Sequence, residues 1–483
     1  MATLSDGNTQ QENRGQWTPL NVWNQLAPRS YNRFVLCFAI ENNKQPAAIN
    51  HIKTCALNVG ARRPVLRSLL KVDGPVALIN KTNQKDIVVD GGGIWNLSGM
   101  SYQRLRQAGF PASAFLHRVF DVPEIPGESV SPALVLRIIC IDGGLLLGIH
   151  LHHSLGDAKA IDDVISWLSA ESRGESYDIK TSTLRGPFPV SNYPIDPSRN
   201  TRTLQPWSTN HRFPERTILS SPLTPSGRLT GYIFAFKTAT LDTIRRQMQQ
   251  LGHTDLPSTN NILISLLWAH VVKARMQAQK TRIIAEAHAK LFTLVDVRKH
   301  VFNDADQANL YFGNAVEAAL TSLPEADLLK ICEVPAVERS TDSLAKLLQP
   351  ICHSVAASIG RVDRNFVQER HAAFCRVADP RNIAFDYSPN DPRSFMLNSW
   401  RYVGLNPGQE WGFPGVDGVR HPDAIRRAAG EWNSPAAVLL PARPGSGELE
   451  VMITVEKEAM NLLCKDAGLR ALVYRIALGN SDD

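Results

Sequence analysis

The residues best suited to chemistry by type and spacing form the run His152-His153-Ser154-Leu155-Gly156-Asp157. A neutral imidazole accepts a proton from an alcohol or an amine near pH 7, so His153 is a candidate general base. Gly156 interrupts the preceding pattern, and Asp157 is a favourable residue to cap a following helix. The positive potential of a helix N-terminus would keep His153 neutral and would favour an oxyanion nearby.

Two strands and a helix are predicted to position this run. Residues 134–141 and 145–152 have strand-like composition, and the turn 142–144 contains two glycines, which tolerate the positive φ of a tight hairpin. Side chains alternate across a strand, so His153 would share a face with the apolar residues of the second strand. The following helix has apolar residues at helical spacing, namely Ile161, Val164, Ile165 and Leu168. The imidazole is therefore expected where a sheet ends and a helix begins.

Other interpretations of the histidines compete with catalysis. A His-His pair at a strand end is more often packed and hydrogen-bonded than catalytic. Metal binding by His150, His152 and His153 is a weaker alternative, because no carboxylate lies at ligand spacing. A serine-centred triad is not supported, because no G-x-S-x-G turn occurs in the chain.

Composition and charge narrow the class of protein. The chain has 483 residues, enough for two domains, and is 43% hydrophobic and 20% charged, as globular proteins are. A net charge of +6 without a long basic run gives no case for nucleic-acid binding. The seven widely spaced cysteines suggest neither disulfides nor zinc and favour a reducing compartment. Residues 1–16 do not resemble a signal peptide and no membrane-length apolar run occurs, so no membrane association and a cytoplasmic location are expected.

The chain divides into two halves of an α/β protein. Residues 1–16 are polar and are expected to be disordered. Residues 17–175 form a predicted N-terminal domain that carries the His153 run. Residues 176–228 are rich in Pro, Ser, Thr and Asn and are expected to form a crossover linker. Residues 229–483 form a predicted C-terminal domain, with strands at 231–236, 291–297, 437–440 and 449–455 and a helix capped by Ser258.

Several separated stretches together resemble the BAHD acyltransferase family. The run from His153 to Asp157 matches its HxxxD motif, and His152 extends the match to the HHxxxD motif of the chloramphenicol acetyltransferase-like superfamily. Further similar stretches are 258–268, 295–298 with 311–315, 398–400 and 409–413. The stretch 101–111 resembles the fungal branch of the family, which includes trichothecene O-acetyltransferases. The resemblance spans nearly the whole chain.

The resemblance implies a fold and a reaction. It implies two chloramphenicol acetyltransferase-like domains, each a mixed sheet flanked by helices, joined by a crossover loop and separated by a solvent channel. Acyl-CoA, with acetyl-CoA the expected form, would enter from one side as co-substrate and a small-molecule acceptor from the other, with His153 midway. Asp157 would point away from the reaction and form a structural salt bridge with an arginine, with Gly156 part of the same structural motif. No bound cofactor, no metal and a monomer are expected.

One segment departs from the family pattern. The family's DFGWG segment reads Glu410-Trp411-Gly412-Phe413-Pro414 here, so the acid is longer and the last glycine is missing. Arg298 is the predicted ionic partner of Glu410. The resemblance makes Asn398 and Trp400 candidate oxyanion donors, with core packing as the alternative for Trp400. Asn314, Trp411 and Gly412 are further candidates for the substrate channel.

The leading hypothesis is direct acyl transfer from acyl-CoA to a hydroxyl of a secondary metabolite, without an acyl-enzyme, because the base activates the acceptor itself. N-acylation is open. A condensation- or cyclisation-type enzyme on the same fold is the second hypothesis, and the absence of an attached carrier domain modestly favours CoA over it. A non-catalytic binding module is the third, supported only by the altered segment at Glu410.

Overall fold

The computed structural model describes residues 17–73, 76–80, 87–94, 101–122, 130–175, 211–212, 229–251, 256–284, 286–333, 340–374, 384–385, 387–429, 434–442 and 445–477. The segment 1–16, expected to be disordered, lies outside these residues. So does the predicted linker 176–228, apart from β9 (His211–Arg212), which pairs with β13 (Ala384–Phe385). Within the described residues, no helix is long and apolar enough to cross a membrane.

The N-terminal half is built on a five-stranded sheet in the order β15-β2-β8-β7-β5. Its strands are β15 (Ala424–Arg427), β2 (Tyr31–Phe38), β8 (Gly144–His152), β7 (Leu134–Ile141) and β5 (Val88–Ile94). β5 and β7 are parallel and the other pairs are antiparallel. The predicted hairpin is confirmed, with Gly143 at φ 75° in its turn. Because that φ favours glycine, the Gly143-Gly144 pair fixes the register that leads to His153.

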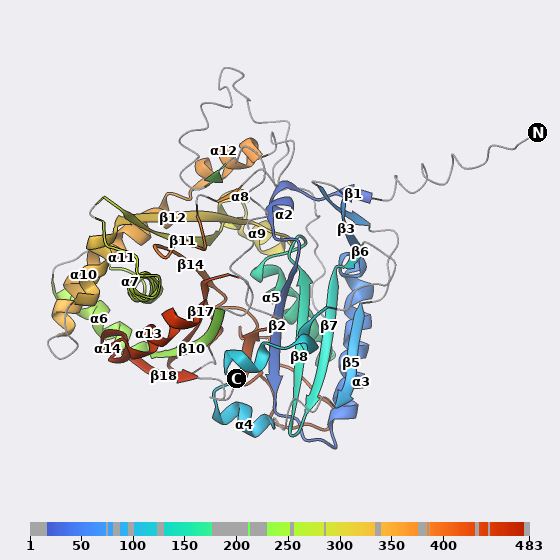
Figure 1. Cartoon of the computed structure of the whole chain (residues 1–483). Helices are drawn as coiled ribbons and strands as arrows, with labels where there is room; N and C mark the ends of the chain where they lie inside the picture. The colour runs from blue at the N-terminus through green and yellow to red at the C-terminus, as the bar shows by residue number, and fades with distance from the viewer. Residues whose placement is uncertain are drawn as a thin grey trace, which may run out of the picture.

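Helices α3 (Gln45–Arg62) and α5 (Ala158–Ser172) pack together over one face of this sheet (Figure 1). Leu145, Leu147, Ile149 and Leu151 of β8 belong to the core between them, as do the predicted apolar residues of α5. The opposite face is covered by α4 (Tyr102–Gln107) and the 3₁₀ turns η2 (Ala112–Phe115) and η3 (Arg118–Phe120). A second sheet has the order β1-β4-β3-β6, with β1 (Trp17–Pro19), β4 (Val76–Asn80), β3 (Leu69–Asp73) and β6 (Val130–Pro132). The turn η1 (Pro64–Arg67) and helix α2 (Val22–Leu26) complete this half.

The C-terminal half is built on a seven-stranded sheet in the order β12-β11-β14-β16-β17-β10-β18. Its strands are β12 (Val316–Pro324), β11 (His288–Asp296), β14 (Ser394–Ser399), β16 (Ala436–Leu439), β17 (Glu448–Glu456), β10 (Leu229–Lys237) and β18 (Val473–Ala477). β14 is parallel to both β11 and β16, so this sheet is also mixed. Mixed sheets flanked by helices in both halves confirm the predicted fold class.

Figure 1 shows the C-terminal sheet curving around α7 (Thr259–Ala278), which is seen end-on. This helix is buried along most of its length, as its nearly continuous apolar sequence requires. Ser258 caps it as predicted, accepting a hydrogen bond from Asn261 N. The remaining helices of this half are α6 (Thr238–Gln250), α8 (Arg298–Val301), α9 (Ala305–Leu310), α10 (Glu325–Glu333), α11 (Thr341–Gly360), α12 (Arg364–Phe374), α13 (Lys457–Lys465) and α14 (Ala467–Arg470).

One part of the predicted C-terminal domain packs with the N-terminal half. Strand β15 pairs with β2, although its residues fall within the range 229–483. Trp400 stacks on Phe34, and Trp411 and Phe413 both lie against Phe38. The predicted range 229–483 thus contains a segment that packs with the N-terminal half, because hydrogen bonding, rather than chain order, places β15 at the edge of the N-terminal sheet.

Candidate active site

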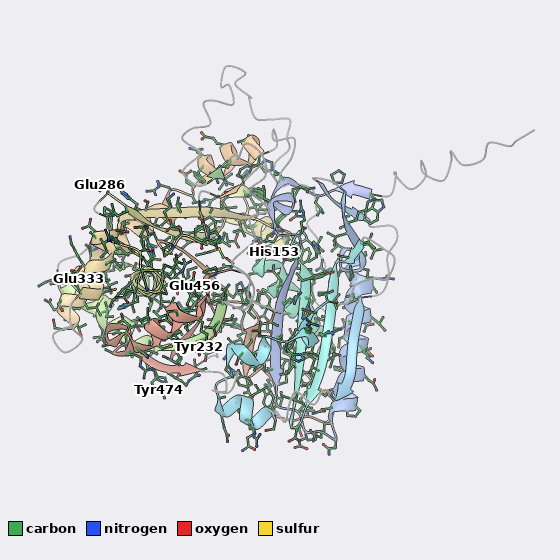
Figure 2. The ribbon with its side chains drawn as sticks, in the orientation of Figure 1. His153, Tyr232, Glu286, Glu333, Glu456 and Tyr474 are labelled. Atoms are coloured by element: carbon green, nitrogen blue, oxygen red, sulfur yellow. The ribbon has the colours of Figure 1, made fainter. Side chains whose placement is uncertain are left out.

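His153 lies directly after β8, between the two halves of the molecule (Figure 2). Its backbone N–H donates to Ser30 O at 2.7 Å, and its carbonyl accepts from Asn314 Nδ2 at 2.7 Å. Asn314 in turn donates from Nδ2 and from its backbone N to Asn24 Oδ1, at 2.8 and 2.9 Å. Groups from both halves thus fix the position of the His153 backbone, which leaves the ring as the part that faces the interior space.

The His153 ring is well placed to act as a neutral base. Burial lowers its pKa below the ordinary value of 6.5, and the backbone hydrogen bond, Asp157 and Asn314 oppose this only in part. Nδ1 is buried and has no hydrogen-bond partner among the described residues. Nε2 is therefore the nitrogen that a substrate can reach. The ring carries no charge near pH 7, as a proton acceptor requires.

Asp157 joins the two halves through a buried salt bridge with an arginine. Its Oδ1 caps α5 by accepting from Lys159 N and Ala160 N at 3.1 and 3.2 Å. The same atom accepts from Arg298 Nη2 at 2.9 Å, and Oδ2 accepts from Ala315 N at 3.0 Å. Burial alone would raise the pKa of Asp157, but Arg298 and the backbone donors outweigh burial and lower it. Asp157 is therefore ionised and links the two halves structurally.

Arg298 is the partner of Asp157, and not of Glu410 as predicted. It also pairs with Asp296 at 3.0 Å and donates to Gly313 O at 2.7 Å. The side chain of Glu410 instead lies 4.0 Å from His421 Nε2. The prediction for this pair was wrong because Arg298 is buried beside β11, where its donors are already used by nearer acceptors.

Gly156 is required by close packing at the start of α5. A Cβ at this position would lie 2.4 Å from Ala160 Cβ and 2.9 Å from Leu151 Cδ2. Those distances are too short for any side chain without a backbone shift. Its carbonyl also accepts from Asn32 Nδ2 at 3.2 Å, which ties the turn to β2. The glycine therefore allows the tight turn between His153 and Asp157.

The neighbouring histidines are packed side chains. His150 is fully buried, and burial together with Arg33 and Arg137 lowers its pKa to about 3. His152 Nδ1 accepts from Ser154 N at 3.2 Å, and its ring packs edge-on against Tyr31. Among the described residues, no group of three or more His, Cys, Asp or Glu side chains could hold a metal ion. The metal alternative thus has no support in the described geometry.

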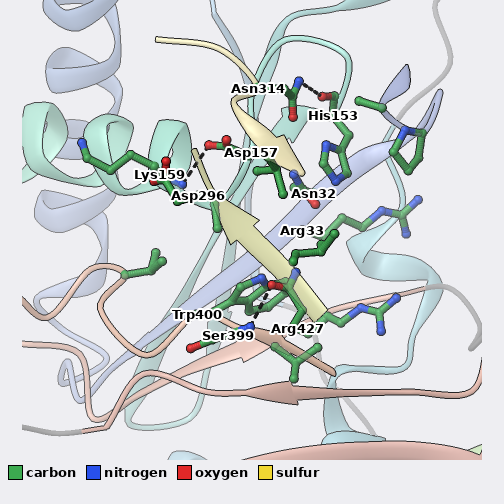
Figure 3. A pocket seen from close by; sticks show the side chains of 18 of the residues that line it. Asn32, Arg33, His153, Asp157, Lys159, Asp296, Asn314, Ser399, Trp400 and Arg427 are labelled. Carbon is green, nitrogen blue, oxygen red and sulfur yellow. Dashed lines mark hydrogen bonds between the residues drawn. The ribbon is translucent and has the colours of Figure 1, made fainter. Parts of the chain in front are cut away.

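A cavity of about 1310 Å³ contains His153 and is lined from both halves. The N-terminal half contributes residues of α2, β2 and the start of α5, and the C-terminal half contributes residues of β11, β12, β14 and the loop after β14. Apolar side chains on the wall include Phe292, Leu294 and Met396. Figure 3 shows His153 in this space, with Lys159 on one side of it and Arg33 and Arg427 on the other.

Trp400 and Asn398 both line the cavity, as predicted for oxyanion donors. Trp400 stacks on Phe34 at 4.0 Å between ring centroids, so it is also a packing residue. Its indole N–H has no hydrogen-bond partner among the described residues. Asn398 Oδ1 accepts from Ser399 N at 2.8 Å, which orients the amide and leaves its NH₂ group available. Both side chains can therefore donate to a developing negative charge in the cavity.

Three other candidates have supporting positions. Both amide hydrogens of Asn314 are already used, by Asn24 and His153, so it is a positioning residue rather than an oxyanion donor. Trp411 is packed in the core and Gly412 N donates to Ser172 Oγ at 3.0 Å. A Cβ on Gly412 would lie 2.8 Å from Ser172 O, which explains the glycine. Neither Trp411 nor Gly412 is among the described residues that line the cavity.

Sequence reasoning missed several residues of the site. Ser30 accepts from the His153 backbone and Asn24 holds Asn314, but neither the short helix α2 that carries Asn24 nor the loop that carries Ser30 has a recognisable motif. Arg33, Arg118 and Arg427 come together only in the folded chain, since they are far apart in sequence. Nothing in the sequence indicated the pairing of β2 with β15.

Comparisons with known proteins agree with this geometry. The chain is 22% identical over 402 residues to trichothecene 8-O-acetyltransferase of Fusarium sporotrichioides, covering 76% of this chain and 78% of that protein. It is 20% identical to O-acetyltransferase ptmV of Penicillium ochrochloron, covering 93% and 94%. Its fold is similar to that of F. graminearum TRI101 complexed with coenzyme A and deoxynivalenol, with a TM-score of 0.72, 19% identity and coverage of 96% and 100%. A structure of vinorine synthase is similar at a TM-score of 0.57 and 14% identity, covering 98% and 95%.

The predicted BAHD resemblance is thereby confirmed over most of the chain. A model of the Transferase family matches residues 122–469, a range that includes His153, Asp157, Arg298 and the segment at Glu410. The chain belongs to the Transferase family.

Proposed function

We propose that this chain transfers an acetyl group from acetyl-CoA to a hydroxyl group of a secondary metabolite, with His153 as the general base. The observation that carries the proposal is a neutral, reachable imidazole nitrogen in a cavity that both halves line. Relatives along most of the chain are O-acetyltransferases of fungal secondary metabolism. This supports an acyltransferase that uses acyl-CoA as co-substrate.

The proposed reaction needs two chemical steps. His153 Nε2 takes the proton of the acceptor hydroxyl while its oxygen attacks the thioester carbonyl carbon. The tetrahedral oxyanion then collapses, the C–S bond breaks, and the imidazolium returns the proton to the sulfur of CoA. Trp400 and Asn398 are the proposed oxyanion donors, and donors of this kind contribute roughly 10²–10³-fold to a rate. No acyl-enzyme is required, because one base serves both steps.

The two sides of the cavity suit different ligands. Lys159, which pairs with Asp163, and Arg401, which donates to Asn260 Oδ1 and pairs with no described carboxylate, are the cavity-lining cations proposed for the phosphates of CoA. Phe292, Leu294 and Met396 offer an apolar wall for a hydrocarbon skeleton. We propose that the chain works as a monomer, since a single chain supplies both walls. A cytoplasmic location is proposed because the six described cysteines are free thiols, as is usual in a reducing compartment.

Acetyl transfer to a panel of polycyclic secondary alcohols, followed by mass spectrometry, tests this proposal. The acetylated alcohol should form with acetyl-CoA and be absent without it. A parallel reaction with an acetylated carrier protein as donor tests the condensation-type alternative. Product only from the carrier-bound donor, or none from acetyl-CoA with any alcohol, would contradict the proposal.

A further inference from the structure

The cavity wall includes a loop that follows β14 and begins at Trp400 (Figure 3). We call residues 400–409 the wall loop. It contains no helix or strand, so contacts with other elements must fix its course. Four further residues of the wall loop line the cavity, namely Arg401, Tyr402, Val403 and Asn406. What holds the wall loop therefore decides where these side chains meet a ligand.

Asp162 of α5, which also lines the cavity, holds the wall loop at three points. Its Oδ1 accepts from Gly404 N at 2.9 Å and from Gln409 Nε2 at 2.7 Å. Asn406 Nδ2 lies 3.3 and 3.4 Å from its two carboxylate oxygens. These donors are neutral, and Asp162 forms no ion pair with a described residue. The carboxylate is therefore committed to the wall loop.

Gln409 closes this network at the end of the wall loop. Its side-chain amide is buried, and the whole residue is only 3% exposed. Nε2 donates to Ser166 Oγ at 2.5 Å as well as to Asp162 Oδ1, and Oε1 accepts from Asn406 N at 2.8 Å. Because Oε1 is used by Asn406, the NH₂ group is the end that faces Asp162. Asp162 and Gln409 thus form a matched acceptor and donor.

Gly404 lets the wall loop come close enough to α5 for these bonds. Its φ of 74° favours glycine, and a Cβ there would lie 2.7 Å from Ile425 Cδ1 and 2.9 Å from Ile165 Cδ1. The loop backbone is therefore pressed against α5 and β15. This approach brings Gly404 N to Asp162.

Trp400 keeps its position without Asp162, whereas the residues after it do not. The Trp400 backbone N donates to Leu439 O at 2.8 Å, which ties it to a strand. Residues 402–406 make no backbone hydrogen bond to a described strand. Asn406 Nδ2 also donates to Tyr402 O at 2.5 Å, so the network around Asp162 reaches the residue next to Arg401.

Arg401 is the cation that stands at this end of the network. Its Nη1 donates to Asn260 Oδ1 at 2.9 Å, and its guanidinium lies 5.5 Å from the centre of the Tyr402 ring. A guanidinium has five N–H donors, so several remain for a ligand on the cavity wall. Phosphate oxygens are acceptors that suit them.

The geometry points to Asp162 and Gln409 as positioning residues for CoA binding, which hold residues 401–406 in the shape that presents Arg401 to the phosphates. This inference rests on the proposed function in assigning Arg401 to those phosphates. A ligand that binds an ordered loop does not have to order it, so less conformational entropy is lost on binding. The pair therefore acts on CoA affinity, while His153 and Trp400 keep their places.

Calorimetric titration of CoA into the full chain tests the inference without turnover. Asp162→Ala removes all three ties and should lower CoA affinity about tenfold, because binding must then order the loop. Asp162→Asn keeps an oxygen that can accept from Gly404 and Gln409, so it should restore most of the affinity. If Asp162 acted only by its charge, both variants would bind CoA more tightly than the wild type, because a charge that repels phosphate is gone. That result, or an unchanged affinity in Asp162→Ala, overturns the inference.

A second substitution tests whether Asp162 acts through Arg401. Arg401→Met should lower CoA affinity in the wild-type background. It should add little in the Asp162→Ala background, because the arginine is then no longer held in place. Equal effects of Arg401→Met in both backgrounds would show that the two residues are not coupled and would overturn the inference.

Ser172→Ala is the matched control on the same helix. Ser172 Oγ accepts from Gly412 N at 3.0 Å, and neither residue is among the described residues that line the cavity. This variant should bind CoA as the wild type does, and a loss as large as that of Asp162→Ala would contradict the inference. Gln409→Leu, which leaves Gly404 bonded to Asp162, should also weaken CoA binding. It provides the test if Asp162→Ala does not fold, and an unchanged affinity there is equally contradictory.

Kinetics separate this inference from the proposed function. With an alcohol that the wild type acetylates, Asp162→Ala should raise KM for acetyl-CoA about tenfold and keep kcat within about twofold. A lower kcat with unchanged KM would overturn the inference. A wild type that binds CoA with this dependence on Asp162 but acetylates no alcohol would reject the proposed function and leave the inference standing. Acetylation by the wild type, together with full CoA affinity in Asp162→Ala, would reject the inference alone.

Discussion

At the scale of single residues, the properties of His153 follow from what surrounds it. Two hydrogen bonds fix its backbone, through Ser30 and Asn314, and burial keeps its ring neutral. The nearby Asp157 is committed to Arg298 and to the cap of α5, so it does not orient the imidazole as the acid of a triad would. As the proposed base, His153 would therefore depend on burial and backbone position for its activity.

The pH dependence of transfer should report the lowered pKa of His153. A general base works in its neutral form, so kcat/KM falls when acid protonates it. Because burial lowers the pKa below 6.5, the half-activity point of the acid limb should lie below pH 6.5. A pH–rate profile measured with acetyl-CoA and one accepted alcohol checks this, and an acid limb centred above pH 6.5 would refute it.

His150 should make the fold sensitive to acid. In the unfolded chain it binds a proton near pH 6.5, whereas in the folded chain it does so only near pH 3. Acidification between these values therefore favours unfolding. From pH 6.5 to pH 5 this single group should remove about 2 kcal/mol of stability. Urea titrations at both pH values should show that acidification lowers the free energy of unfolding less for His150→Leu than for the wild type. Equal decreases in the two proteins would exclude this role of His150.

At the scale of elements, the start of α5 is joined to the start of α8 in the other half by one buried ion pair. Arg298 and Asp157 are only 6% and 7% exposed in their side chains, and Ala315 N adds a further bond to the same carboxylate. Asp296 pairs with the same arginine but is 53% exposed. The two carboxylates thus offer a matched comparison of a buried and an exposed partner.

Asp157→Asn should destabilise the protein far more than Asp296→Asn. Removing one charge of a buried pair leaves the other uncompensated and costs about 3 kcal/mol, whereas an exposed pair contributes less than about 1 kcal/mol. Free energies of unfolding from urea titrations at pH 7 measure both. Asparagine still caps a helix, so the difference reports the ion pair. Equal decreases in the free energy of unfolding for the two variants would show that the Asp157 ion pair stabilises the fold no more than the exposed Asp296 pair does.

Most elements near the site could be predicted from local patterns. The hairpin of β7 and β8, the glycine turn and the cap at Asp157 follow from alternation, turn chemistry and capping, all of which are local. The partner of Arg298 and the pairing of β15 with β2 could not be predicted, because contacts between residues distant in sequence leave no periodic signal. The identity of Asn314 as a positioning residue likewise depends on Asn24, which is 290 residues away.

At the scale of the whole molecule, the two halves line one cavity, and a strand from the second half of the chain belongs to the sheet of the first. Strand β15 is the edge of the N-terminal sheet, and Trp400, Trp411 and Phe413 fill the core beneath β2. Chain segments from the second half are therefore structural parts of the first.

A fragment of residues 1–228 should not fold alone. It lacks β15 and the aromatic residues after β14, so it would expose the edge of β2 and the apolar face around Phe34 and Phe38. We expect no cooperative urea transition by circular dichroism for this fragment. Co-expression with residues 229–483 should restore soluble, cooperatively folding material. A fragment that unfolds cooperatively by itself would show that the N-terminal half folds without β15 and the aromatic residues after β14.

The most direct test of the account is to measure acetyl transfer by the His153→Ala protein. The rate is read from the release of the CoA thiol from acetyl-CoA, with an alcohol that the wild-type protein acetylates as acceptor. Loss of a general base should lower kcat by roughly 10²–10⁴-fold. CoA affinity and the urea midpoint should stay unchanged, because the ring makes no hydrogen bond from Nδ1 to any described residue and its backbone contacts remain. A His153→Ala protein that transfers acetyl groups within a few-fold of the wild-type rate would contradict the assignment of His153 as the base.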